Sequence, residues 1–348
     1  MTRPIRLADV ARAAGVSLGT ASNVFNRPDA VRMELREVVL RAAKELGYAG
    51  PDPKGRLLMG GKAHAIGLLP PGDMPVAHAI GSPYLREIAF GIAEICDQNG
   101  ANLLILSGSL EHKAWAIHNA LVDGFILGHA DEVAMVSARP LRVPMVVMDM
   151  DAGPAAGSVR IDGRGGARMA AEHMLALGHR RFAVLSVLRR PVDAVWHAPG
   201  PNRRLQAANP LDQEKLEGYA EALAGAGLSI DNMPIVEAHP PLPWAEAGAC
   251  MLLDRAPEAT AILAMSDRHA ITVLVEATRR GIAVPTDLSV IGFDDAPDAA
   301  TVMPPLTTIS QPIAEKGRIA ASMLFAGVTS HEHLPVRLIV RGSTGPAR

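Results

Sequence analysis

The sequence predicts a small α-helical head joined by a linker to a larger α/β body. The first 48 residues show helical periodicity broken by one glycine-containing turn, whereas from residue 65 short apolar runs alternate with helical stretches. Continuous apolar strands between helices are typical of parallel sheets covered on both faces. A chain of 348 residues with 49% hydrophobic content is also too long for one ordinary core. We therefore expect a head at 1–48, a linker at 49–64 and a body at 65–348.

The first predicted helix is about two turns long and carries a single apolar stripe, as expected for a helix packed on one side. The stripe has the spacing i, i+3, i+4 and i+7 and consists of Leu7, Val10, Ala11 and Ala14. Gly15 then permits the backbone conformation that a sharp stop requires. Ser17 is placed to cap the next helix by accepting a backbone N–H near its start.

The second predicted helix has two unlike faces. Its apolar side is formed by Ala21, Val24 and Phe25. Its thin outer face is formed by Leu18, Gly19, Ser22 and Asn23. A third helix follows from about residue 33, with inward positions Leu35, Val38, Val39, Ala42 and Leu46. A helix, a tight turn and a second helix capped by serine form the arrangement in which one helix braces another inside the DNA major groove.

Charge is distributed unevenly along the chain. Residues 1–62 contain 11 Lys and Arg against 6 Asp and Glu, a net charge of +5. Because the whole chain carries −2, the remainder carries −7. A basic head on an acidic body favours a polyanionic partner at one end of the protein only.

The linker at 49–64 is rich in residues that disfavour regular structure. It holds prolines at 51 and 53 and glycines at 50, 55, 60 and 61. Each glycine costs a helix about 1 kcal/mol relative to alanine, and short isolated helices are marginal in any case. This stretch is not expected to hold a helix unaided.

The body is predicted to contain two parallel sheets, since eight strands over roughly 280 residues exceed the usual size of one sheet. The predicted strands are 65–70, 102–107, 124–128, 143–149, 181–187, 233–237, 260–265 and 288–293. The predicted helices are 84–99, 111–120, 164–177, 212–226, 245–255, 269–281 and 312–326.

Ligands of open α/β sheets bind at the carboxyl ends of the strands. Several carboxylates follow the predicted strands, among them Asp149, Asp267 and Asp294. Carboxylates there suit a polyhydroxylated ligand, but the same pattern would also fit an enzyme.

Other functional classes find little support. The chain has no G-x-S-x-G elbow between a predicted strand and a predicted helix, and it has no G-x-x-x-x-G-K-[ST] or H-E-x-x-H motif. Its 12 histidines show no metal-ligand spacing, and Cys96 and Cys250 form no C-x-x-C pair, so we expect no metal, cofactor or disulfide framework. No apolar run has the length of a secretion signal or a membrane span. We expect a cytoplasmic protein without a membrane partner.

Specific motifs resemble one known family. The run L-x-D-V-A-x-x-A-G-V-S-x-x-T-x-S-x-V-x-N from Leu7 to Asn26, followed by E-L-G-Y at 45–48, resembles the DNA-binding head of the LacI/GalR family of bacterial transcription regulators. Further segments resemble the family's effector-binding core, including V-D-G-F-I-L at 122–127, V-I-G-F-D-D at 290–295 and P-P-L-T-T-I-S-Q-P at 304–312. The resemblance covers nearly the whole chain. It implies a body of two lobes, similar to periplasmic sugar-binding proteins, with a small molecule in the cleft.

The resemblance also implies a set of DNA-binding residues in the head: Ser17, Leu18, Gly19, Thr20, Ser22, Asn23 and Asn26. The family usually reads bases from the first two positions of the second helix and from an arginine four residues on, where this chain has Leu18, Gly19 and Asn23. Asparagine pairs best with adenine, whereas arginine pairs best with guanine. We therefore expect an A·T pair opposite Asn23, unless this side chain contacts only phosphate or solvent.

Within the linker, Gly55-Arg56-Leu57-Leu58 matches the family's A-R-x-L motif. The family folds this segment into a helix on DNA and inserts a leucine into the minor groove. By that match Leu58 is the wedge and Arg56 a groove or phosphate contact. The alternative is an inert tether, because Gly55 weakens a helix.

Matching the core motifs predicts the following effector contacts: Asp149, Lys215, Trp244, Ser266, Phe293, Asp294 and Gln311. Lys215 stands where arginine is usual in the family, and Ser266 stands where asparagine is common. The effectors of the family are mainly sugars, sugar phosphates and purines, and these two departures prevent a choice among them. Trp244 could instead be core filler, and Asp294 a structural cap. The arginine-bearing segment 188–211 could form a phosphate-binding edge or a surface loop.

Together these features predict a ligand-responsive transcription regulator, most simply a repressor. It is expected to bind a near-palindromic double-stranded operator as a homodimer, because two heads on two half-sites require two-fold symmetry. No heptad tail of the kind that makes tetramers follows Arg341. The alternatives are a solute-binding protein, disfavoured by the basic head, and a sugar- or nucleotide-modifying α/β enzyme.

Overall fold

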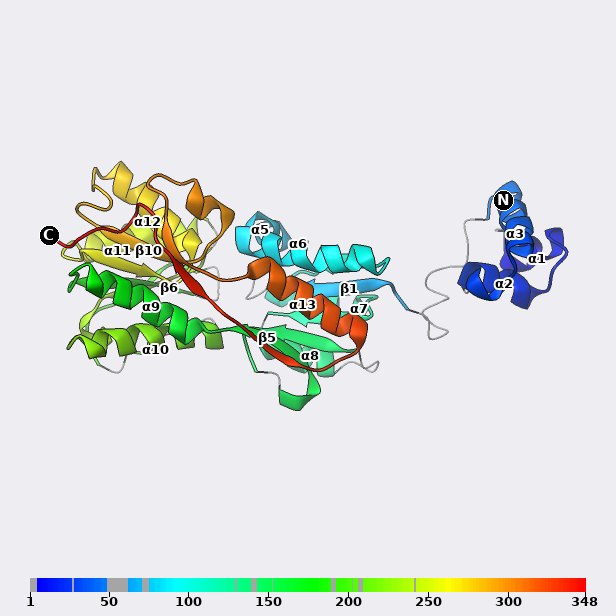
Figure 1. Ribbon diagram of the computed structural model, residues 1–348, viewed down its shortest axis with the longest axis horizontal. Helices are drawn as coiled ribbons and strands as arrows, with labels where there is room; N and C mark the ends of the chain where they lie inside the picture. Colours follow the sequence, from blue (N-terminus) through cyan, green and yellow to red (C-terminus); the bar gives the residue numbers. More distant parts are fainter. Residues whose placement is uncertain are drawn as a thin grey trace. The chain divides into compact units, whose positions relative to one another are not determined.

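The computed structural model describes residues 5–26, 28–48, 62–70, 75–128, 130–138, 143–151, 153–188, 192–201, 203–205, 209–240 and 242–348. The chain divides into two compact units, Met1–Ala63 and His64–Arg348. The first unit is the head and the second is the two-lobed body (Figure 1).

The head contains three α-helices within its described residues: α1 (Leu7–Ala13), α2 (Leu18–Asn26) and α3 (Met33–Leu46), with a short 3-10 turn at Pro28–Ala30. They enclose a small core formed by Val10, Ala11, Ala21, Val24, Val39, Ala42 and Ala43. The ring of Phe25 packs edge-on against that of Tyr48 with centroids 5.6 Å apart. The predicted turn is confirmed, since Gly15 has φ +66°. The predicted cap is confirmed as well, because the backbone N–H of Thr20 donates to Ser17 Oγ at 3.0 Å.

Two inward positions predicted for the third helix are wrong. Leu35 is 38% exposed and Val38 is 44% exposed. The buried residues of α3 lie from its middle onward, at Val39, Ala42 and Ala43. A helix of 14 residues is about 21 Å long, and helices of 7 and 9 residues cannot cover that whole length.

The body contains two sheets, as predicted. The first lobe has six parallel strands in the order β12-β5-β4-β3-β1-β2. These strands are β1 (Ala65–Leu69), β2 (Asn102–Ile105), β3 (Gly124–Leu127), β4 (Met145–Met148), β5 (Gly157–Ile161) and β12 (His331–Leu334). Its helices are α5 (Val76–Gly81), α6 (Pro83–Gln98), α7 (Leu110–Asn119), α8 (Ala130–Ser137) and α13 (Ile313–Ala326).

The second lobe has seven strands in the order β13-β11-β10-β9-β6-β8-β7, of which the outer two run antiparallel to their neighbours. These are β6 (Phe182–Val187), β7 (Val195–His197), β8 (Ile235–Ala238), β9 (Ala261–Ala264), β10 (Ser289–Asp294), β11 (Thr307–Ser310) and β13 (Arg337–Ile339). Its helices are α9 (Gly163–Ala176), α10 (Pro210–Gly225), α11 (Trp244–Arg255) and α12 (Asp267–Arg279).

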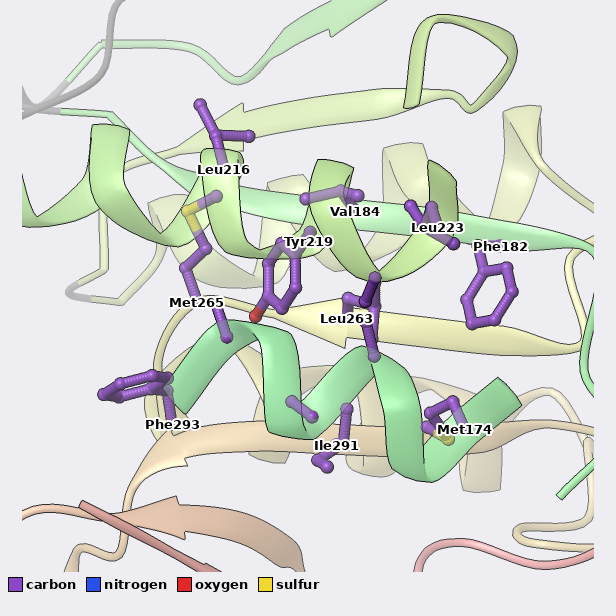
Figure 2. Packing of buried hydrophobic residues seen from close by; sticks show 14 of the residues in the cluster. Met174, Phe182, Val184, Leu216, Tyr219, Leu223, Leu263, Met265, Ile291 and Phe293 are labelled. Atoms are coloured by element: carbon purple, nitrogen blue, oxygen red, sulfur yellow. The ribbon is translucent and has the colours of Figure 1, made fainter. Parts of the chain in front are cut away.

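Helices α9 and α10 lie side by side on one face of the second sheet (Figure 1). Figure 2 shows the core that they form with the strands, where Tyr219 of α10 and Met174 of α9 lie near Leu263 and Ile291. All four side chains are fully buried. This core fixes the strand ends from which the second lobe presents its polar side chains.

The chain crosses between the lobes three times. The crossings join β5 to α9, β11 to α13, and β12 to β13. As a result, α13 follows a strand of the second lobe but packs in the first, against α6, β4 and β5.

The expectation of eight strands is wrong, because the described residues contain five more: β5, β7, β11, β12 and β13. These strands lack a continuous apolar run. Strand β12 has the sequence HEHL and β11 has TTIS, and β7 and β13 are short, partly exposed edge strands. Helices α5 and α8 were also unforeseen.

Within segment 188–211, Arg203 is bound by main-chain carbonyl groups. Part of the segment is edge strand β7, whose His197 Nε2 lies 2.8 Å from Glu237 Oε2. Arg203 donates to the main-chain carbonyls of Met233 and Ile230, both at 2.5 Å. Arg189 and Arg190 lie outside the described residues. Among the described residues, no helix has the length and hydropathy needed to cross a membrane.

Close helix packing in the first lobe depends on two glycines. A methyl group added at Gly317 of α13 would overlap the carbonyl oxygen of Ile88, and one added at Gly91 of α6 would overlap that of Ala314. The two helices can approach this closely only because neither glycine carries a side chain.

We predict that Gly317→Ala lowers the free energy of unfolding of the body by about 1–3 kcal/mol, because the helices must separate. The control is Gly225→Ala at the end of α10, where an added methyl meets nothing within 4 Å. That variant should change stability by no more than about 1 kcal/mol. Urea denaturation followed by circular dichroism measures both. Equal stability of the two variants would contradict the packing account.

Candidate functional site

The outer face of α2 is the candidate DNA-reading surface of the head. Leu18 is 55% exposed, and Gly19 and Asn23 are also exposed. Thr20 and Ser22 are half-buried, and the Thr20 hydroxyl lies 2.9 Å from that of Ser17. Leu18, Gly19 and Asn23 are therefore accessible to base edges, whereas the Thr20 hydroxyl is engaged with the capping Ser17.

The remaining predicted DNA contacts are Asn26, Arg56 and Leu58. Asn26 is the last residue of α2. Arg56 and Leu58 lie outside the described residues.

The body has a cavity of about 190 Å³ between its lobes. It lies at the carboxyl ends of strands from both sheets, where ligand sites of open α/β folds occur. Its wall includes Gly128 after β3, Asp149 after β4, Leu188 after β6, His239 after β8, Ser266 after β9, Asp294 at the end of β10 and Gln311 after β11. Aliphatic side chains such as Leu85, Met148 and Ile271 complete it.

The structure brings five of the seven predicted effector residues to this cavity: Asp149, Lys215, Ser266, Asp294 and Gln311. The other two are not part of its wall. Phe293 is fully buried, and its ring lies 4.2 Å from Lys215 Nζ, so it supports the cavity from behind. Trp244 begins α11 and packs edge-on against the rings of His78 and His239, at 5.7 and 5.4 Å. It contacts a lining residue rather than the cavity itself.

A buried ammonium group organises the polar groups of the first lobe. Lys316 of α13 is completely buried, and its Nζ lies 2.5 Å from Asp149 Oδ2. The same Nζ donates to the hydroxyl of Tyr84 at 2.9 Å and to Gln311 Oε1 at 3.0 Å. Tyr84 in turn donates to Asp149 Oδ2 at 3.2 Å. Burial and the adjacent Asp149 raise the pKa of Tyr84 well above its ordinary value.

A second set of polar contacts lies in the other lobe. Lys215 Nζ donates to the carbonyl oxygen of Met265 at 2.9 Å and lies 3.8 Å from Asp212 Oδ1. Gln311 Nε2 donates to Asp294 Oδ1 at 2.7 Å. Burial raises the pKa of Asp212 and that of Asp294 to about 6, although Lys215 opposes both shifts.

Asp267 adds a further carboxyl group at the cavity wall. It accepts the backbone N–H of Ala296 at 2.8 Å and the hydroxyl of Thr308 at 2.5 Å. Burial, with the nearby Asp294, raises the pKa of Asp267 to about 8.

Two carboxylate oxygens at the cavity, Asp149 Oδ1 and Asp212 Oδ2, have no hydrogen-bond partner among the residues that the structure describes. Both are acceptors, and a buried acceptor without a donor is costly. The backbone at Asp149 and Asp294 also adopts positive φ values of 55° and 128°, which are uncommon for non-glycine residues and cluster at functional sites. The cavity therefore favours a ligand that donates hydrogen bonds.

Sequence reasoning missed four residues of this site: Tyr84, Asp212, His239 and Lys316. One signal was available for Lys316, because it lies on the same helix face as Ile313 and Gly317, which are buried. A lysine on an apolar face indicates a buried partner. His239 could have been found by the rule that ligands bind at strand ends, because it directly follows β8. Tyr84 and Asp212 stand in sequence contexts that do not distinguish them from surface residues.

Comparisons with known proteins show similarity over nearly the whole chain. Residues 6–50 match the model of bacterial regulatory proteins of the lacI family, and residues 171–344 match that of the periplasmic binding protein-like domain. An HTH-type transcriptional regulator of Mycobacterium tuberculosis is 34% identical over 357 residues, covering 99% of this chain and 98% of the relative. The HTH-type transcriptional regulator CelR of Thermobifida fusca is 31% identical over 355 residues, covering 95% and 94%.

Two solved structures extend the likeness to three dimensions. The lac repressor dimer bound to operator and the anti-inducer ONPF has a TM-score of 0.76 at 28% identity, covering 99% of this chain and 100% of that one. The complex of CelR with cellobiose has a TM-score of 0.67 at 28% identity, covering 98% and 100%. The head, the two-lobed body and these relatives agree: the chain is a DNA-binding transcription regulator of the lacI family of bacterial regulatory proteins.

Proposed function

We propose that the protein is a cytoplasmic repressor that binds a palindromic operator as a homodimer and responds to a sugar-like effector in the cavity between its lobes. The observation that carries the effector assignment is the pair of unpartnered acceptors, Asp149 Oδ1 and Asp212 Oδ2. Neighbouring hydroxyl groups of a sugar would donate to them. A phosphate group is disfavoured, because it would bring further negative charge to the cavity wall. This wall holds five aspartates, including Asp294 and Asp298, and its Lys and Arg side chains are Lys215 and Arg268.

The known relatives support the same proposal. The lac repressor structure contains a dimer on operator DNA, and CelR binds the disaccharide cellobiose. A dimer places two copies of α2 on two half-sites, and the body must supply the two-fold axis. Large apolar side chains that a second copy could cover are exposed on the body at Ile80, Phe90 and Val275.

The roles of the head residues follow from their exposure. Asn23 and Leu18 of α2 are placed to face bases, whereas Ser17, Thr20 and Ser22 are better suited to the phosphate backbone. We also propose Arg56 and Leu58 as minor-groove contacts of the operator-bound form.

Selection of bound sequences from random duplex DNA, at a fixed salt concentration, tests the DNA-binding proposal. We expect a two-fold symmetric consensus with an A·T pair at one position of each half-site that depends on Asn23. Asn23→Ala should abolish that preference and weaken binding by about 1–3 kcal/mol, because a bidentate contact to adenine is lost.

The matched control is Asn99→Ala, which changes an exposed asparagine of the body. It should leave the consensus and the affinity unchanged. A consensus without two-fold symmetry would argue against the dimer. A G·C pair that persists at the tested position in Asn23→Ala would refute the proposed reading by Asn23.

Thermal unfolding with a panel of neutral sugars and their phosphorylated counterparts tests the effector proposal. A neutral sugar at 100 times its dissociation constant should stabilise the body by about 2.7 kcal/mol. Asp149→Asn and Asp294→Asn should reduce this stabilisation, whereas Asp97→Asn on the surface should not. Binding should also weaken as pH falls from 7 to 5, since Asp212 and Asp294, with pKa values of about 6, then become protonated and lose acceptor capacity.

The sign of the pH effect follows from the raised pKa values. Above pH 6 both groups are mainly carboxylates and can accept from hydroxyl groups, and below it they are mainly neutral. A panel in which only phosphorylated sugars stabilise the protein would contradict the effector class. Stabilisation that is identical in Asp149→Asn, Asp294→Asn and the wild type would exclude this cavity as the binding site.

A further inference from the structure

Lys316 contacts the first lobe and a residue of the crossing that leads to the second. Its side chain is completely buried, and three acceptors surround the ammonium: Asp149 Oδ2, the Tyr84 hydroxyl and Gln311 Oε1. A lysine ammonium has three N–H donors. Each donor therefore has one acceptor, and Lys316 has no remaining donor for a ligand.

Gln311 extends these contacts into the second lobe. It lies between β11 and α13, on one of the three crossings, and is 5% exposed. Its Oε1 accepts from Lys316, and its Nε2 donates to Asp294 Oδ1 at 2.7 Å. These two contacts fix the orientation of the amide, because only its nitrogen can donate and only its oxygen can accept.

A continuous path of polar contacts thus runs Asp149–Lys316–Gln311–Asp294. Its two ends are carboxyl groups that line the cavity from opposite lobes. Removing one member of a buried charged pair leaves the other uncompensated, which is strongly destabilising. The path therefore penalises any movement that separates Lys316 from either end.

We propose that Lys316 is a positioning residue of the effector cavity, which couples the lobes by holding Asp149 and, through Gln311, Asp294 in one fixed relation before a ligand binds. The proposal rests on the proposed function only in taking this cavity as the effector site. Lys316 does not itself contact the ligand. It sets the separation of the carboxyl groups that do.

The distance distribution between spin labels on the two lobes tests this coupling. One label is placed at Gln98 of α6 and the other at Glu246 of α11, both exposed, after replacement of Cys96 and Cys250 by alanine. The full chain is measured without DNA or effector, and labelled chains are diluted with unlabelled ones so that only distances within one chain contribute.

Lys316→Met should broaden the distribution relative to the wild type, because the path between the lobes is cut while side-chain volume is nearly kept. The matched control is Lys113→Met. Lys113 is 1% exposed and lies 3.0 Å from Glu132 Oε1, but α7 and α8, which carry this pair, both belong to the first lobe. This control removes a buried ion pair without touching the path, so its distribution should match that of the wild type.

Gln311→Met supplies a second variant if Lys316→Met fails to fold. It keeps the contact of Lys316 with Asp149 but removes both contacts of Gln311, the one with Lys316 and the one with Asp294, so it should broaden the distribution as well. An unchanged distribution in Lys316→Met, or in Gln311→Met where that variant is used, would overturn the proposal. Equal broadening in Lys113→Met would overturn it too, since the effect would then reflect general loss of stability. None of these results depends on whether the protein binds DNA or a sugar.

Discussion

The cavity between the lobes depends on one constraint: the charged groups buried there must be compensated by partners of opposite charge. Charged side chains meet there from both lobes: Asp149 after β4, Asp212 and Lys215 on α10, Asp294 at the end of β10 and, behind Asp149, Lys316 on α13. Moving a carboxylate or an ammonium out of water costs several kcal/mol unless a partner of opposite charge and good hydrogen bonds replace the solvent. The ammonium groups offset this burial only in part, because burial still raises the pKa of Asp212 and that of Asp294 to about 6 against the opposing effect of Lys215.

The fold supplies the partners by its connectivity. Strand ends bring Asp149 and Asp294 to the cavity, whereas Lys316 arrives on α13, which starts directly after a crossing from the second lobe. The close approach of α13 to α6, which Gly91 and Gly317 permit, holds Lys316 beside Tyr84. Helix packing and the polar site are therefore parts of one arrangement, and the ligand completes it by supplying donors to the acceptors that the protein leaves open.

The sequence predicts the central elements of this structure better than its edges. The eight expected strands are found with ends that differ by at most two residues, because buried parallel strands are continuous apolar runs. Strand β12 with its sequence HEHL was missed, since an exposed edge strand needs no such run. Leu35 shows the converse error, because its apolar character predicts burial that the short head helices cannot provide.

The residues of the candidate site also differ in how well the sequence predicts them. Asp149 and Asp294 could be predicted, because the rule that ligands bind at strand ends applies to them directly. Tyr84 could not, because it meets Lys316 only when α13 packs on α6 after the chain has crossed between the lobes. The apolar helix face around Lys316 indicates that the lysine has a buried partner, but not which residue this partner is. Phe293 was placed correctly at a strand end, but whether its ring faces the cavity or the core behind Lys215 depends on packing that a local motif does not encode.

A regulator of this design must transmit occupancy of the cavity to the head, and only a ligand with different affinities for the two states can do so. The most direct measurement is the affinity of the full chain for its effector, by calorimetry, with and without saturating operator DNA. Thermodynamic reciprocity requires that the operator change effector affinity by the same factor by which the effector changes operator affinity, typically about 5- to 150-fold. The account predicts two equal factors that differ from one. An effector affinity that operator DNA leaves unchanged would contradict it.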